Sequence, residues 1–150
     1  MPDLRIVTAL PQSLRPAYEA LLASAGLRDE GDADCTALLS SDGGALLACG
    51  SVSGRVLKQI AVAPWAEGDG ACARIVTALL EESARRGVAH PFLYTKPKNA
   101  RLFRSLGFFP VAETADMLMM EHRRGGVERY IASLPAYDGE SGAVVCHANP

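Results

Sequence analysis

The sequence predicts an α/β (α+β) fold in which a mixed, mostly antiparallel sheet is flanked by helices. Short apolar runs alternate with stretches whose apolar residues recur at helical spacing, and glycine-containing turns separate most of them. Three of the runs follow one another with only short turns between them, which favours antiparallel neighbours. The expected element order is therefore β α β β β α β α β β, with a glycine-rich loop before the longest helix.

The bulk properties of the 150 residues indicate one domain of an ordinary globular protein. A formal net charge of −2 argues against nucleic acid and anionic membrane as partners, because neither would attract the chain. The polar N-terminus does not resemble a signal peptide, and no apolar run approaches the roughly 18 residues of a membrane span. The four cysteines form no C-x-x-C pair, so we expect a reduced, cytoplasmic protein without a metal site.

The first half of the chain predicts one strand, one helix and three further strands. The apolar run 4–7 predicts the first strand, and the helix after it begins near Pro11 and ends at Gly26. Residues 28–34 are acidic and predict a loop. The three antiparallel strands are expected at residues 35–40, 45–52 and 56–62.

The second half begins with a strong amphipathic helix, expected over residues 71–86. Apolar residues mark one face of this helix, charged residues mark the other, and Gly87 ends it. The remaining elements are a strand at 92–95, a helix at 99–106, and a closing pair of strands at 108–114 and 117–121.

The segment richest in chemical signals is the turn between the strand 56–62 and the helix 71–86. The first N–H groups of a helix have no partner inside the helix, and the helix dipole is positive there. Such a turn binds phosphate when side chains stay clear of it, and glycine keeps them clear. The candidate ligand-binding residues are Ala61, Val62, Ala63, Gly68, Asp69, Gly70, Ala71 and Cys72.

The same turn also has a purely structural interpretation. Many strand-to-helix turns carry glycine only for its backbone freedom. The third glycine of the dinucleotide-binding fingerprint is missing here. The local sequence therefore leaves anion binding and simple backbone geometry both open.

Residues 67–72, Glu-Gly-Asp-Gly-Ala-Cys, resemble the signature of the GNAT acyltransferases, which is Arg or Gln, two residues, Gly, one residue, then Gly or Ala. Gly70 keeps the central glycine. Glu67 replaces the leading Arg or Gln and would repel a pyrophosphate. Cys72 replaces the closing Gly or Ala and adds bulk where phosphate oxygens approach.

A second stretch strengthens this resemblance. The strand 92–95 is followed by Asn99 and a helix that ends in Gly107-Phe108, as in the GNAT family. The resemblance implies that Asn99 and Phe103 contact the cofactor, and that the strands 56–62 and 92–95 diverge to admit it. Many members have a tyrosine at the position of Phe103, where it protonates the leaving thiolate. Phenylalanine cannot donate a proton, so no catalytic residue is assigned.

A narrower resemblance links the chain to the N-terminal region of the citrate lyase ligase family. It rests on LACGSVSG at residues 47–54, on residues 56–58, 94–96 and 102–104, and on the tail GAVVCHANP at residues 142–150. It implies a GNAT-like domain over residues 1–124. A connecting helix and linker would follow over 125–142, and residues 143–150 would begin a truncated nucleotidyltransferase domain.

The resemblance also implies a ligand and a partner. The ligand is acetyl-CoA or a CoA-like phosphopantetheine group, and ATP would enter only through the missing C-terminal domain. The partner is the acyl carrier subunit of citrate lyase, whose thiol the ligase acetylates with ATP and acetate. A stand-alone acetyl-CoA-dependent N-acetyltransferase and a degenerate structural domain remain as alternatives.

A few side chains outside these motifs have two interpretations. Lys96, Lys98, Arg101 and Arg104 form either a solvated basic face or a docking patch for an acidic carrier or phosphate. Trp65 is expected to be a packing anchor, and His122 a surface residue. Cys72 lies at a helix N-terminus, which would lower its pKa, although no histidine beside it supports nucleophilic catalysis.

Overall fold

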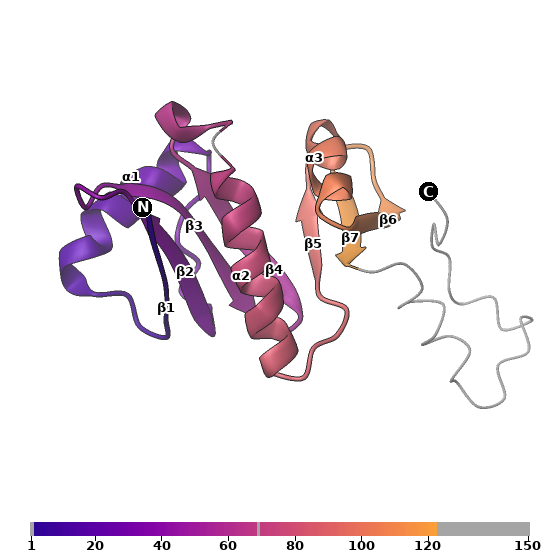
Figure 1. Cartoon of the computed structure of the whole chain (residues 1–150). Helices are drawn as coiled ribbons and strands as arrows, with labels where there is room; N and C mark the ends of the chain where they lie inside the picture. The colour runs from indigo at the N-terminus through magenta and orange to yellow at the C-terminus, as the bar shows by residue number, and fades with distance from the viewer. Residues whose placement is uncertain (1, 69, 123–150) are drawn as a thin grey trace, which may run out of the picture. The chain divides into compact units, whose positions relative to one another are not determined.

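The computed structural model describes residues 2–68 and 70–122 and divides the chain into two compact units, residues 1–89 and 90–150 (Figure 1). The expected linker at 125–142 and the expected start of a further domain at 143–150 lie outside the described residues. We also expect residues 143–150 to pack poorly, because an isolated strand cannot satisfy its backbone groups, and this prediction too concerns residues outside the described ones.

The first unit contains four consecutive strands, each antiparallel to the next. They are β1 (Asp3–Val7), β2 (Cys35–Ser40), β3 (Leu46–Ser53) and β4 (Val56–Val62). The boundaries agree with the predicted runs to within one residue. The antiparallel pairing of the three strands that follow the acidic loop is confirmed.

Two main helices cover opposite faces of these strands. They are α1 (Arg15–Ser24), preceded by the 3-10 turn η1 (Gln12–Leu14), and α2 (Ala71–Arg85), preceded by η2 (Pro64–Ala66). Cys49 packs in the core cluster with Leu22 of α1, whereas the neighbouring Gly50 faces Ile75 of α2. Successive residues of a strand point to opposite faces, so the two helices lie on different sides of β3.

The strand β4 carries a bulge that fixes the loop before β2. The register between β3 and β4 shifts between Cys49 and Ser51, and Gln59 adopts a left-handed φ of 55°. The buried Gln59 donates from Nε2 to the carbonyl oxygen of Arg28 at 2.6 Å. Next to it, Lys58 Nζ pairs with Glu30 at 2.7 Å. The acidic loop is therefore tied to the strand that leads into the glycine turn.

The second unit is a small antiparallel sheet with one helix. Its elements are β5 (Phe92–Thr95), η3 (Pro97–Asn99), α3 (Ala100–Ser105), β6 (Phe108–Glu113) and β7 (Leu118–His122). The strand β7 pairs with both β5 and β6. The helix predicted from residue 99 begins one residue later, because Asn99 closes a 3-10 turn and occupies the N-cap position of α3.

Within the described residues, no helix is long and apolar enough to cross a membrane.

Candidate ligand-binding site

The glycine turn begins where β4 leaves its partner strand. The N–H of Ala63 still donates to the carbonyl oxygen of Leu47, at 2.8 Å, and the chain then enters η2. Gly68 and Gly70 follow with left-handed φ angles of 88° and 78°, and α2 begins at Ala71. L-residues with a side chain rarely adopt this conformation, which explains both glycines.

The N-terminus of α2 offers backbone donors that have no partner among the residues that the structure describes. Gly70 is the N-cap residue and has no side chain to cap the helix, and the described first turn contains no acidic residue. The first hydrogen bond of the helix runs from the N–H of Arg74 to the carbonyl oxygen of Gly70, at 3.1 Å. The N–H groups of Ala71, Cys72 and Ala73 precede it and have no acceptor within the helix. Fifteen residues of α2 align their dipoles behind these groups, which favours an anion.

The turn is open around its two glycines. A Cβ atom built on Gly68 or on Gly70 would have no described atom within 4 Å apart from those of its chain neighbours. The glycines are therefore required for backbone conformation rather than for lack of space. An open approach to unpaired N–H groups fits the phosphates of a CoA-type ligand, so the local geometry is compatible with the predicted site.

The other predicted residues of this segment contribute through the backbone. Ala61 and Ala63 are buried in the core cluster beside α1, and Val62 is half-buried. Asp69 lies outside the described residues.

Cys72 is half-buried, and burial raises the pKa of its thiol. The expectation that the helix N-terminus lowers this pKa is therefore wrong.

The two remaining predicted ligand residues belong to the second unit. Asn99 donates from Nδ2 to Thr95 Oγ1 at 3.1 Å, which fixes its side chain at the end of β5. Phe103 is only 6% exposed, and its ring packs edge-on against Phe108 with 6.0 Å between centroids. Phe103 thus has a clear packing role. That Asn99 and Phe103 share a site with the glycine turn stays a prediction.

Two expectations about aromatic side chains are wrong. Trp65 is 66% exposed and does not anchor the turn, because Ala66 takes the buried position of η2. The ring of His122 is half-buried rather than on the surface, with its centroid 5.2 Å from that of Phe108. The indole of Trp65 therefore lies in solvent three residues before Gly68.

The structure also contains a cluster of buried polar side chains that the sequence analysis did not single out. Thr36 and Ser51 share a hydrogen bond of 2.9 Å between hydroxyls, and Tyr18 Oη donates to Gln59 Oε1 at 3.5 Å. Burial raises the pKa of Tyr18. The signal in the sequence was the presence of polar residues inside otherwise apolar strands.

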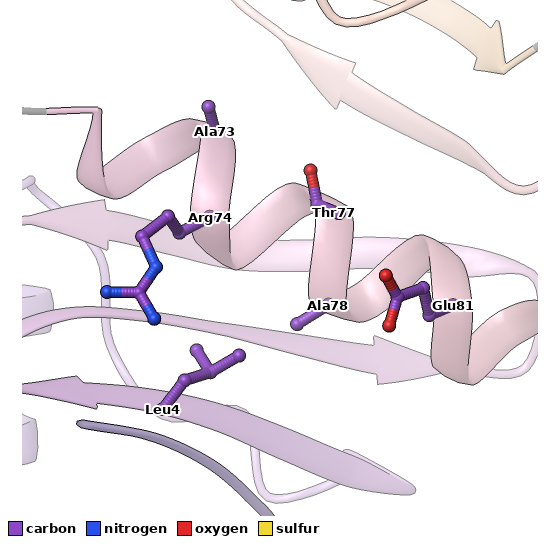
Figure 2. Close-up of a pocket in the computed structure, with 6 residues that line it drawn as sticks. All are labelled: Leu4, Ala73, Arg74, Thr77, Ala78 and Glu81. Carbon is purple, nitrogen blue, oxygen red and sulfur yellow. The ribbon is translucent and has the colours of Figure 1, made fainter. Parts of the chain in front are cut away.

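A pocket of about 280 Å³ lies between α2 and β1 and begins at the first turn of the helix (Figure 2). Its lining residues are Leu4, Ala73, Arg74, Thr77, Ala78 and Glu81. None of them is a predicted ligand residue, and the lining is mostly apolar. Within 2–68 and 70–122, no group of three or more His, Cys, Asp or Glu side chains could hold a metal ion.

Comparison with known proteins shows which proteins are similar to this chain in sequence. No protein-family model matches the chain. The citrate (pro-3S)-lyase ligase of Klebsiella pneumoniae is 38% identical over 124 residues, which cover 79% of this chain and 36% of that protein. The chain is homologous to the N-terminal third of this ligase. The ligase of Escherichia coli K12 is 31% identical over 109 residues, covering 70% of this chain and 31% of that protein. The chain thus spans about a third of the length of the ligases it matches.

Solved structures establish the fold. An acyl-CoA N-acyltransferase from Pseudomonas aeruginosa has a TM-score of 0.70 at 15% identity, covering 81% of this chain and 99% of that protein. The N-acetylglutamate synthase of Neisseria gonorrhoeae, complexed with coenzyme A and N-acetyl-glutamate, has a TM-score of 0.63 at 16% identity. That match covers 81% of this chain and 35% of the synthase. The chain has the GNAT acyltransferase fold, and the predicted fold class is confirmed.

Proposed function

We propose that this chain is the acyltransferase-fold part of a citrate lyase ligase. It binds a CoA-type pantetheine group and supports the ATP- and acetate-dependent acetylation of the carrier thiol of citrate lyase. The observation that carries the proposal is the 38% identity to a ligase over 124 residues. Activation of acetate by ATP belongs to a further domain of such a ligase.

The proposed binding site is the N-terminus of α2. Its unpaired N–H groups would hold the phosphates of the ligand, and the open turn at Gly68 and Gly70 leaves them accessible. The Neisseria synthase has the same fold and is complexed with coenzyme A, which supports a CoA-type ligand for this chain. When bound, the ligand supplies a thiol that can carry an acetyl group. The protein holds and orients the pantetheine arm.

Two side chains favour presentation of a carrier-bound thiol over direct transfer from free acetyl-CoA. Glu67 is exposed three residues before Gly70, where its charge opposes a pyrophosphate. Phe103 is buried against Phe108 and offers no proton for a leaving thiolate. General acid catalysis typically contributes about two to four orders of magnitude in rate, so its loss weakens direct transfer.

The test is calorimetry of the chain with acetyl-CoA, CoA and dephospho-CoA. We expect weak but measurable binding of dephospho-CoA and weak binding of the other two ligands, because all three carry the pyrophosphate that the charge of Glu67 opposes. Failure to bind any of the three would refute the proposal and favour the degenerate structural domain.

The second candidate is a stand-alone N-acetyltransferase, which the fold of the Pseudomonas enzyme favours. Turnover of acetyl-CoA with a panel of small amines distinguishes it from the first. A rate near the ~10 per second typical of enzymes would establish the second candidate. No turnover, together with binding of dephospho-CoA, would support the ligase role.

A further inference from the structure

Acidic and basic residues are unevenly distributed along this chain. No acidic residue occurs between Glu82 and Glu113, although the chain as a whole carries a formal net charge of −2. The basic residues of that interval are Arg85, Arg86, Lys96, Lys98, Arg101 and Arg104. The last four belong to the second unit, and all four are exposed. None of these four forms an ion pair with a residue that the structure describes.

These four cations lie in the same segment as an exposed leucine. The turn η3 runs directly into α3, where Phe103 points into the core and Leu102 is 44% exposed. Lys98 lies four residues before Leu102 and three before Arg101, so helical spacing makes them neighbours. We call the following five residues the α3 surface: Lys96, Lys98, Arg101, Leu102 and Arg104.

Most of the α3 surface does not stabilise its own helix, and only Arg104, in the last turn, suits the helix dipole. Lys98 and Arg101, and again Arg101 and Arg104, are like charges three residues apart, which repel each other. The first turn of α3 has no acidic residue, and the side chain of the N-cap residue Asn99 donates to Thr95 and does not cap the helix. The pattern as a whole therefore lacks an explanation in the stability of α3.

We propose that the α3 surface docks an acidic protein, the acyl carrier that presents its thiol to this domain. The inference rests on the proposed function and adds the surface through which the carrier is recognised. From Lys96 to Arg104 the cations are spread along η3 and α3 over on the order of 12 Å, whereas a single phosphate requires donors that converge on one point. A solvent-exposed leucine among spread cations fits a protein face with carboxylates around an apolar residue.

The experiment measures binding of the whole chain to the acyl carrier subunit of citrate lyase without its prosthetic group. This carrier has no phosphate, so binding reports the protein surface alone. The test variant is Arg101→Glu, and the matched control is Arg5→Glu, an exposed arginine on β1 that makes the same charge change. Free dephospho-CoA is titrated separately against all three proteins.

We expect Arg101→Glu to weaken carrier binding about tenfold at low salt, with a smaller loss as salt is raised, and Arg5→Glu to leave it unchanged. Binding of dephospho-CoA should stay the same in both variants. The thermal unfolding midpoint of Arg101→Glu should equal or exceed that of the unmodified chain, because two like-charge pairs become opposite pairs. This excludes loss of folding as the cause.

Three results would overturn the inference. If carrier binding is unchanged in Arg101→Glu while dephospho-CoA still binds, the surface is wrong and the proposed function stands. If Arg101→Glu loses dephospho-CoA but retains the carrier, the surface is a phosphate site instead. If the unmodified chain binds neither dephospho-CoA nor the carrier, the proposed function fails as well.

Discussion

Gly50 of β3 lies so close to Ile75 of α2 that a Cβ atom on Gly50 would be 2.7 Å from Cγ2 of Ile75. The same atom would be 2.8 Å from Cδ1 of Leu79, and both side chains are fully buried. The strand and the helix therefore pack in direct contact at this point. Because α2 presents the glycine turn at its N-terminus, this contact helps to position the candidate site.

Replacing Gly50 with alanine should destabilise the fold by overpacking. We expect Gly50→Ala to lower the free energy of unfolding by about 1–3 kcal/mol, because the added Cβ would overlap the fully buried side chains of Ile75 and Leu79. Each kcal/mol corresponds to roughly 2–4 °C in the unfolding midpoint for a protein of this size. The control is Gly43→Ala, where the added Cβ would meet only Ser41 Oγ at 3.9 Å. Equal midpoints for the two variants would contradict the contact.

Replacing Gly70 with valine should abolish binding of the pantetheine ligand. The branched side chain would stand over the N–H groups of α2, and it would also strain the left-handed backbone by about 1–2 kcal/mol. Gly87→Val is the matched control, because Gly87 follows the other end of α2 with a φ of 84° and open space around its Cβ. Both variants should lose similar stability in denaturant titrations. Calorimetry with dephospho-CoA should show lost affinity only for Gly70→Val, and unchanged affinity there would exclude the turn as the site.

Reversing the charge of Glu67 should strengthen binding of CoA. Arginine at this position would attract the pyrophosphate, and we expect roughly three- to tenfold tighter binding at low salt, fading as salt screens the interaction. Glu81→Arg is the control, since Glu81 is exposed and lies on the order of 15 Å further along α2. A gain of equal size in both variants would indicate a general charge effect rather than a local one.

Alkaline pH should destabilise the fold through a buried thiol. Burial raises the pKa of Cys49 to about 12 from an ordinary value of 9.0, so the unfolded chain releases this proton at lower pH than the folded chain does. The stability is therefore fully present below pH 9 and falls as the pH rises from about 9 toward 12. Urea titrations between about pH 8 and pH 10.5 should show this decline. Cys49→Ala should be less stable overall but lose less stability over that range, and an unaltered slope would refute the assignment.

The elements that the sequence predicted well are those marked by patterns among neighbouring residues. The strand β4 and the helix α2 were predicted to within a residue, because apolar residues mark their buried positions and Gly87 ends the helix. The candidate turn followed from Gly68 and Gly70, and both adopt the left-handed backbone that the turn requires.

The features that were missed depend on contacts between distant parts of the chain. Gln59 carries no local signature of a left-handed residue; its conformation is stabilised by a hydrogen bond to Arg28, 31 residues earlier. The exposure of Trp65 depends on which residue of η2 faces the core. The pKa of Cys72 depends on how much protein surrounds the thiol, and this burial raises it.

The anchoring of residues 28–34 to β4 also affects the order in which parts of the chain can fold during synthesis. Lys58 reaches Glu30 and Asp32 across separations of 28 and 26 residues, and Gln59 reaches Arg28. The acidic segment leaves the ribosome well before these partners do. A nascent chain that stops before residue 58 lacks these contacts and keeps only others, such as the ion pair between Asp29 and Arg15 at 3.3 Å. The segment should therefore be cut by protease in a chain arrested there and resist cutting once β4 has emerged and paired.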